Sequence, residues 1–101
     1  MKEPTESEIK EVWEWCGFYE EIKVESEHSW KRWVYPDGQT STSLPSIDLN
    51  NLFKDATDRV RDKIGEKEYY KLLLRWINIF TENNSDPALA LFWAIQELIK
   101  E

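Results

Sequence analysis

Cysteine, histidine and glycine are scarce in this sequence of 101 residues, and their scarcity excludes several kinds of site. There is one cysteine, Cys16, one histidine, His28, and three glycines. A lone cysteine forms no disulfide within the chain, and with one histidine it cannot make a zinc site. Isolated glycines form no phosphate-binding loop. The sequence therefore predicts no metal site, and the single cysteine is typical of a reducing cytoplasm.

Long apolar runs and positive charge are also missing. No stretch approaches the roughly 20 apolar residues that a membrane helix needs, and the start MKEPTESE lacks the apolar core of a signal peptide. Thirteen basic residues against 20 acidic ones give a net charge of −7. Such a charge repels phosphates and disfavours binding to a nucleic-acid backbone. We expect a soluble cytoplasmic protein without a membrane partner.

Helix start signals are present at three places. The sequence TESE at residues 5–8 is a capping box, and an apolar stripe of helical period follows it. Asp48 is an N-cap for a second stripe, which ends near Gly65. Asp86 is the N-cap of the last helix, where Pro87 takes the first position.

Residues 67–81 fit two secondary structures, and we predict a helix. A strand would alternate apolar and polar residues, but three leucines stand together from Leu72 to Leu74. On a helical wheel the two kinds of side chain separate. The polar arc is narrow and holds Lys71, Arg75, Asn78 and Glu82, whereas the opposite side holds Tyr69, Leu72, Leu73, Trp76, Ile77 and Phe80. A strand is the alternative.

Three short segments have the composition of strands, namely residues 18–24, 30–35 and 39–43. The turn sequence YPDG at residues 35–38 joins the last two. Together with about four helices, these strands predict an α+β fold with a small antiparallel sheet. The length and the six tryptophans indicate a single globular domain over residues 1–101.

Four segments together are similar to one protein family. They are WCGF at residues 15–18, YPDG at 35–38, LP at 44–45 with LNNLF at 49–53, and DPALALFWAI at 86–95. In this order and spacing they resemble the small phage and prophage proteins grouped as the phage α-β-α sandwich domain. The resemblance implies a compact α-β-α sandwich, expressed from a bacterial virus or an integrated prophage. It implies no reaction, ligand or catalytic residue.

The start of the last helix is apolar on every side. Leu89, Ala90 and Trp93 lie on the arc that becomes polar one or two turns later. A helix that is apolar all round is normally buried, which favours cover by other helices or a loop. The alternative is an exposed patch where a partner protein or a second copy docks.

A second candidate site lies on the aromatic strand. Trp30 and Arg32 share one face of an extended strand, and Trp33 and Tyr35 share the other. The outward face would be able to stack a base or nucleotide beside a cation. Packing of both faces against helices is the favoured interpretation, because aromatic strand residues usually pack.

Catalytic patterns are absent from the sequence. No Ser-His-Asp or Cys-His arrangement has support from spacing. Asp55, Asp58 and Asp62 are three and four residues apart and would be able to share a hard cation. Lysine and arginine residues alternate with them, so a salt-bridged outer face is favoured. We predict no catalytic residue, metal or cofactor, with a hydrolase built on Asp55 or Asp58 as the alternative.

The leading functional hypothesis is a non-enzymatic accessory protein of a phage or prophage. It would act in the cytoplasm of the bacterial host by binding a host or viral protein, for example as an inhibitor of host defence. Self-association is a further option. The alternatives are a nucleotide-binding protein that uses the aromatic strand and a structural component of the virion.

Overall fold

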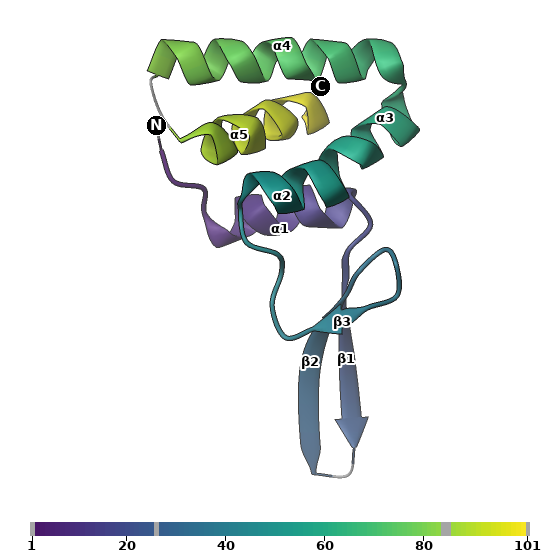
Figure 1. Ribbon diagram of the computed structural model, residues 1–101. Helices are drawn as coiled ribbons and strands as arrows, with labels where there is room; N and C mark the ends of the chain where they lie inside the picture. The colour runs from purple at the N-terminus through teal and green to yellow at the C-terminus, as the bar shows by residue number, and fades with distance from the viewer. Residues whose placement is uncertain (1, 26, 84–85, 101) are drawn as a thin grey trace.

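The fold is known from a computed structural model, which describes residues 2–25, 27–83 and 86–100 (Figure 1). Along the chain its elements are α1 (Glu6–Trp15), β1 (Tyr19–Glu25), β2 (His28–Val34), β3 (Thr40–Ser41), α2 (Leu49–Asn51), the π-helical turn η1 (Leu52–Thr57), α3 (Asp58–Ile64), α4 (Glu66–Asn83) and α5 (Pro87–Ile99). The three strands form one antiparallel sheet in the order β1-β2-β3. The predicted α+β class is therefore confirmed.

The helices begin where their sequence signals predict. Thr5 Oγ1 accepts a hydrogen bond from the Glu8 amide at 3.2 Å, and the Glu8 carboxylate accepts one from the Thr5 amide at 2.9 Å. The Asp86 carboxylate accepts from the Ala88 amide at 2.7 Å. Residues 67–81 lie within α4, so the helix prediction is confirmed and the strand alternative is wrong.

The second predicted helix is continuous but contains the wider π turn. Leu52, Ala56 and Val60 are spaced by four residues, and all three are fully buried. In a regular α-helix such a spacing drifts around the axis by about 40° at each step. The π turn η1 widens the helix at the first of these steps and keeps the three side chains against the core.

The core is built around α5, which lies between α4 and α1 (Figure 1). Its central side chains Leu91, Phe92 and Ile95 have no exposed surface. They belong to one cluster with Val12, Trp13, Cys16, Phe18, Leu52, Ala56, Val60, Leu72, Ala88, Ala94 and Leu98. This central position explains why the start of α5 is apolar on every side, because helices on several sides bury it.

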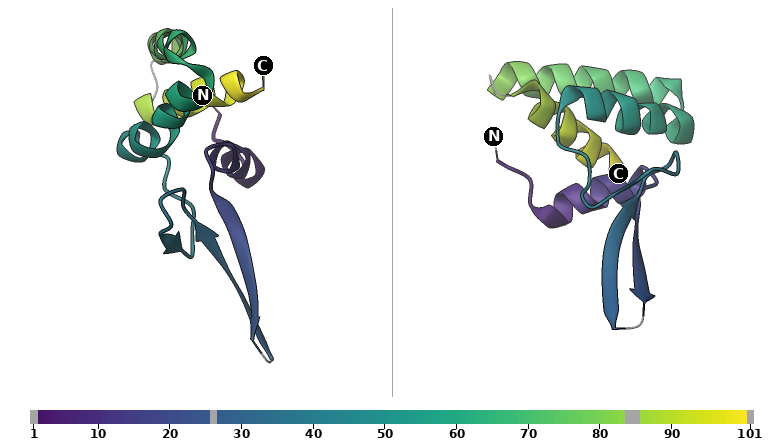
Figure 2. Two further views of the ribbon diagram at one scale, coloured as in Figure 1. Left: turned by 90° about the vertical axis from the view of Figure 1, so that its right-hand side faces the viewer. Right: turned by 60° about the horizontal axis from the view of Figure 1, so that its bottom comes forward.

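The β1–β2 hairpin projects from the helices, and both views of Figure 2 show its outer end standing clear of them. Its seven cross-strand pairs run from Tyr19 opposite Val34 to Glu25 opposite His28. At the base, Phe18 is buried and its ring lies 5.1 Å from that of Trp13. The predicted strand at residues 18–24 places Ile22 and Val24 on the same face as Phe18, yet Ile22 is 58% exposed and Val24 74%. The helices therefore cover only the base of the sheet, whereas a sandwich would cover one face along its whole length.

Candidate functional site

The candidate interface at the start of α5 is largely covered. Ala90 is fully buried, so no partner can reach it, and the exposed-patch interpretation is wrong for this residue. Leu89 and Trp93 are half-buried. The Trp93 indole donates a hydrogen bond to the Lys2 carbonyl at 2.9 Å, which ties the N-terminal segment over this end of the helix.

An open hollow of about 500 Å³ lies beside Trp93. Its polar lining includes Glu8 and Gln96, whose side chains are joined by a hydrogen bond of 3.2 Å. The backbone amide of Thr5 is the main cause that lowers the pKa of Glu8. Glu8 is thus already engaged at the start of α1 by the capping box.

The four residues proposed for ligand stacking do not form one site. Trp30 and Arg32 lie on one face of the hairpin. Trp33 lies on the other face and packs against the core. Tyr35 follows the strand, with its ring 4.7 Å from that of Phe18 and its hydroxyl donating to the Ser43 carbonyl at 3.2 Å. A single ligand therefore cannot contact all four side chains.

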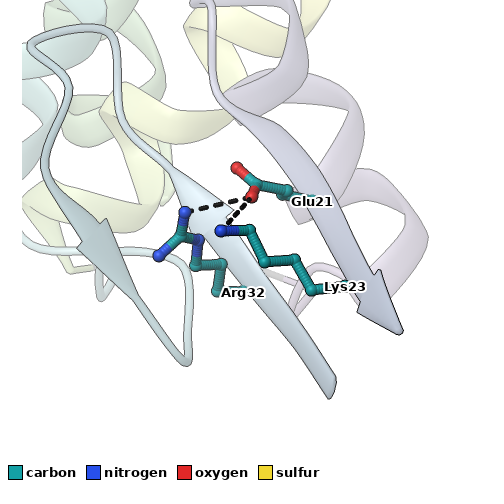
Figure 3. A network of polar contacts seen from close by, with 3 residues as sticks. All are labelled: Glu21, Lys23 and Arg32. Carbon is teal, nitrogen blue, oxygen red and sulfur yellow. Dashed lines mark hydrogen bonds and ion pairs between the residues drawn. The ribbon is translucent and has the colours of Figure 1, made fainter. Parts of the chain in front are cut away.

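Trp30 and Arg32 instead belong to a small network with β1, whose charged members Glu21, Lys23 and Arg32 are drawn in Figure 3. The Glu21 carboxylate lies 3.0 Å from Arg32 Nη2 and 3.8 Å from Lys23 Nζ. Both cations also lie over the Trp30 ring, Arg32 at 5.1 Å and Lys23 at 5.7 Å from its centroid. Each contact contributes on the order of 1 kcal/mol or less. The network holds the two strands together, and a stacking ligand would have to displace Arg32.

The carboxylates of the second helix line a smaller hollow of about 240 Å³ together with Lys54 and Arg59. The pKa of Asp55 is raised, mainly because the carboxyl group is partly buried. The charge of Lys54 lowers this pKa, and the charges of Asp37 and Asp58 raise it further. In the described parts of the chain, no three histidine, cysteine or acidic side chains are arranged to hold a metal ion. Lys54 and Arg59 lie beside these carboxylates as the sequence indicates, but among the described residues no ion pair joins them to the three aspartates, so the salt bridges expected on this face are not formed.

Cys16 is a buried core residue, and its thiol is expected to be inert in the folded protein. Burial raises its pKa from 9.0 to about 12. The neutral thiol therefore stabilises the fold fully below pH 9, and this contribution is lost as the pH rises toward 12. The free energy of unfolding should fall more steeply between pH 9 and 12 in the wild type than in Cys16→Ala, as measured by urea titration. Equal slopes, or rapid alkylation of native Cys16 at pH 8, would contradict this prediction.

An exposed apolar surface lies on α4, on the side turned away from α5. We call Tyr70, Leu74, Ile77 and Phe80 the α4 stripe; they are 60%, 63%, 50% and 40% exposed. On the side facing α5, by contrast, Leu72 is buried. The sequence analysis placed Ile77 and Phe80 on the apolar side of this helix together with Leu72, and it did not predict their exposure. The available signal was the width of the apolar arc, which exceeds what one neighbouring helix can cover.

Comparison with protein-family models, with characterised proteins and with solved structures found no match for the chain. No described helix is long and apolar enough to cross a membrane. The α4 stripe must therefore be interpreted from its own geometry and chemistry.

Proposed function

We propose that this protein is a non-enzymatic binding protein whose partner, another protein, docks on the α4 stripe. The observation that carries the proposal is the exposure of four large apolar side chains on one helix of 18 residues. Tyr70, Leu74 and Ile77 are spaced by four and three residues and so form one ridge along the helix. Contiguous exposed apolar surface of this kind marks interaction sites.

The surroundings of the stripe indicate the chemistry of the partner. Lys67, Lys71 and Asn78 are exposed along one side of the ridge, and Lys71 lies 3.3 Å from Glu68. A complementary surface is an apolar groove or a second helix with an acidic rim on that side. An acidic rim would suit the two lysines, and the apolar floor would remove the stripe from water.

The biological setting proposed for this binding is a phage or prophage. The four segments that resemble the phage α-β-α sandwich domain support it. In that setting the partner is a host or viral protein in the bacterial cytoplasm, and interference with host defence is one possible consequence of binding.

Site-specific photo-cross-linking in the bacterium that produces the protein tests the proposal. With p-benzoylphenylalanine at position 74, we expect one protein adduct of defined mass. The same residue at position 11, which is exposed on α1 and away from the stripe, should give none. Adducts of equal yield at both positions, or no adduct at either, would refute docking on the stripe.

Once the partner is identified, Ile77→Glu should weaken its binding at least about tenfold, because a charge then lies in the centre of an apolar contact. Thermal unfolding should change little, since Ile77 is half exposed. Isothermal titration calorimetry measures the first effect and circular dichroism the second. Asn50→Glu serves as the matched control, because it adds the same charge at an exposed polar position on α2, away from the stripe.

A further inference from the structure

β1 is an edge strand over its whole length. The strand order β1-β2-β3 leaves one side of β1 without a neighbour within the described chain. The opposite edge of the hairpin is shorter, because β3 pairs with Trp33 and Val34 of β2. An edge of seven residues that stands clear of the helices is a ready site for pairing with another strand.

The backbone groups that face this open edge can be assigned from the ladder. The Tyr35 amide donates to the Gln39 carbonyl at 2.8 Å, on the β3 side of β2. Because direction alternates along a strand, the polar backbone groups of Val34 point the other way, toward β1. Val34 is opposite Tyr19, so the backbone groups of Tyr19 point toward β2. Those of Glu20, Ile22 and Val24 therefore point to the open edge.

We propose that β1 pairs antiparallel with β1 of a second copy, about a two-fold axis at Ile22. This inference concerns a different surface from the α4 stripe and does not depend on it. In this register Glu20 lies opposite Val24 of the second copy, and Ile22 lies opposite its own counterpart. All three residues with outward backbone groups then find partners, and the two sheets join into one.

The side chains select this register. Glu21 lies opposite Lys23 of the second copy, and Lys23 lies opposite its Glu21, so opposite charges meet twice. A two-fold axis perpendicular to the sheet keeps the same face of both hairpins on the same side. Because side chains alternate between the faces, the register can shift only in steps of two residues. A shift one way places Glu21 against Glu21, and a shift the other way places Lys23 against Lys23. Like charges directly opposite each other disfavour both alternatives.

The exposed apolar side chains on the hairpin support the same register. Ile22 would contact its counterpart in the second copy, which removes part of its large exposed surface from water. On the other face the ion-pair network of Figure 3 would continue across the axis, from Arg32 and Glu21 to Lys23 of the second copy, which lies over its own Trp30 ring. Charges on an edge strand commonly prevent pairing, whereas here they favour the register about Ile22 over the registers on either side of it.

Light scattering of the purified full chain at submillimolar concentration tests the proposal. We expect a mass of twice 12.1 kDa for the wild type. Ile22→Pro should be a monomer, because proline removes the amide at the centre of the open edge and leaves the hydrogen bonds to β2 intact. Lys31→Pro is the matched control. Lys31 lies opposite Ile22 but faces the other edge of the hairpin, so this variant should remain a dimer.

A covalent readout keeps the test decisive if Ile22→Pro fails to fold. In Ile22→Cys the two new thiols would face each other with Cα atoms about 5.5 Å apart, within reach of a disulfide. Oxidised glutathione should convert this variant to a linked dimer and leave Lys31→Cys monomeric on a non-reducing gel. Cys16 is buried and should not compete. A wild-type mass of 12.1 kDa, equal cross-linking of both variants, or a dimer that persists in folded Ile22→Pro would overturn the proposal.

Discussion

Replacing Ala90 with glutamate is expected to unfold the protein. Ala90 has no exposed surface and lies on α5, at the centre of the helices. The new side chain would bring extra volume and an unpaired carboxylate into a packed core. The combined cost should exceed about 4 kcal/mol, against a total stability of about 5–15 kcal/mol for a typical domain. Circular dichroism and urea titration measure the loss.

Leu74→Glu provides the control for this experiment, because it places the same charge on the exposed α4 stripe. Its free energy of unfolding should stay within about 0.5 kcal/mol of the wild type. The pair of variants separates a buried apolar helix from an exposed one. A folded Ala90→Glu variant, or an unfolded Leu74→Glu variant, would show that the two surfaces have been assigned the wrong way round.

Truncation of Trp13 is expected to have the next largest effect. Trp13 is fully buried and links α1 to the base of the sheet through Phe18. Trp13→Ala should lower the free energy of unfolding by about 3–5 kcal/mol, because it leaves a large cavity. Differential scanning calorimetry should show a correspondingly lower melting temperature.

Trp13→Phe should cost clearly less than Trp13→Ala. The indole Nε1 of Trp13 is buried, and no hydrogen-bond partner for it lies in the described part of the chain. Phenylalanine keeps most of the ring contacts and removes this unpaired donor, whose burial itself costs free energy. Equal losses in the two variants would indicate that the Trp13 site tolerates no change of ring shape.

The helices were predictable because their signals are local. The capping box before α1 and the Asp-Pro start of α5 need only neighbouring residues, and both form as the sequence indicates. The helix over residues 67–81 followed from three adjacent leucines, which no alternating strand accommodates. The strands were placed to within about two residues, because turn residues and β-branched side chains also act over short distances.

Burial of each element was harder to predict, because it depends on neighbours that are distant in sequence. The apolar start of α5 has the same pattern whether helices cover it or a partner does, and only the fold shows that Ala90 is enclosed. Alternation on β2 separated Trp30 from Trp33, but it gave no indication that Trp33 alone would pack against the core. The projection of the hairpin likewise leaves no mark in the pattern of β1.

The projecting hairpin also determines how the molecule diffuses. The radius of gyration is 15.0 Å and the longest dimension 53 Å, whereas about 13 Å is the usual radius of gyration for a chain of 100 residues. An elongated particle has a larger Stokes radius than a sphere of the same mass and leaves a gel-filtration column early. A monomer of this protein would therefore elute ahead of globular standards of its own mass. Its elution position alone would overstate the number of subunits, and a sedimentation experiment should show a raised frictional ratio.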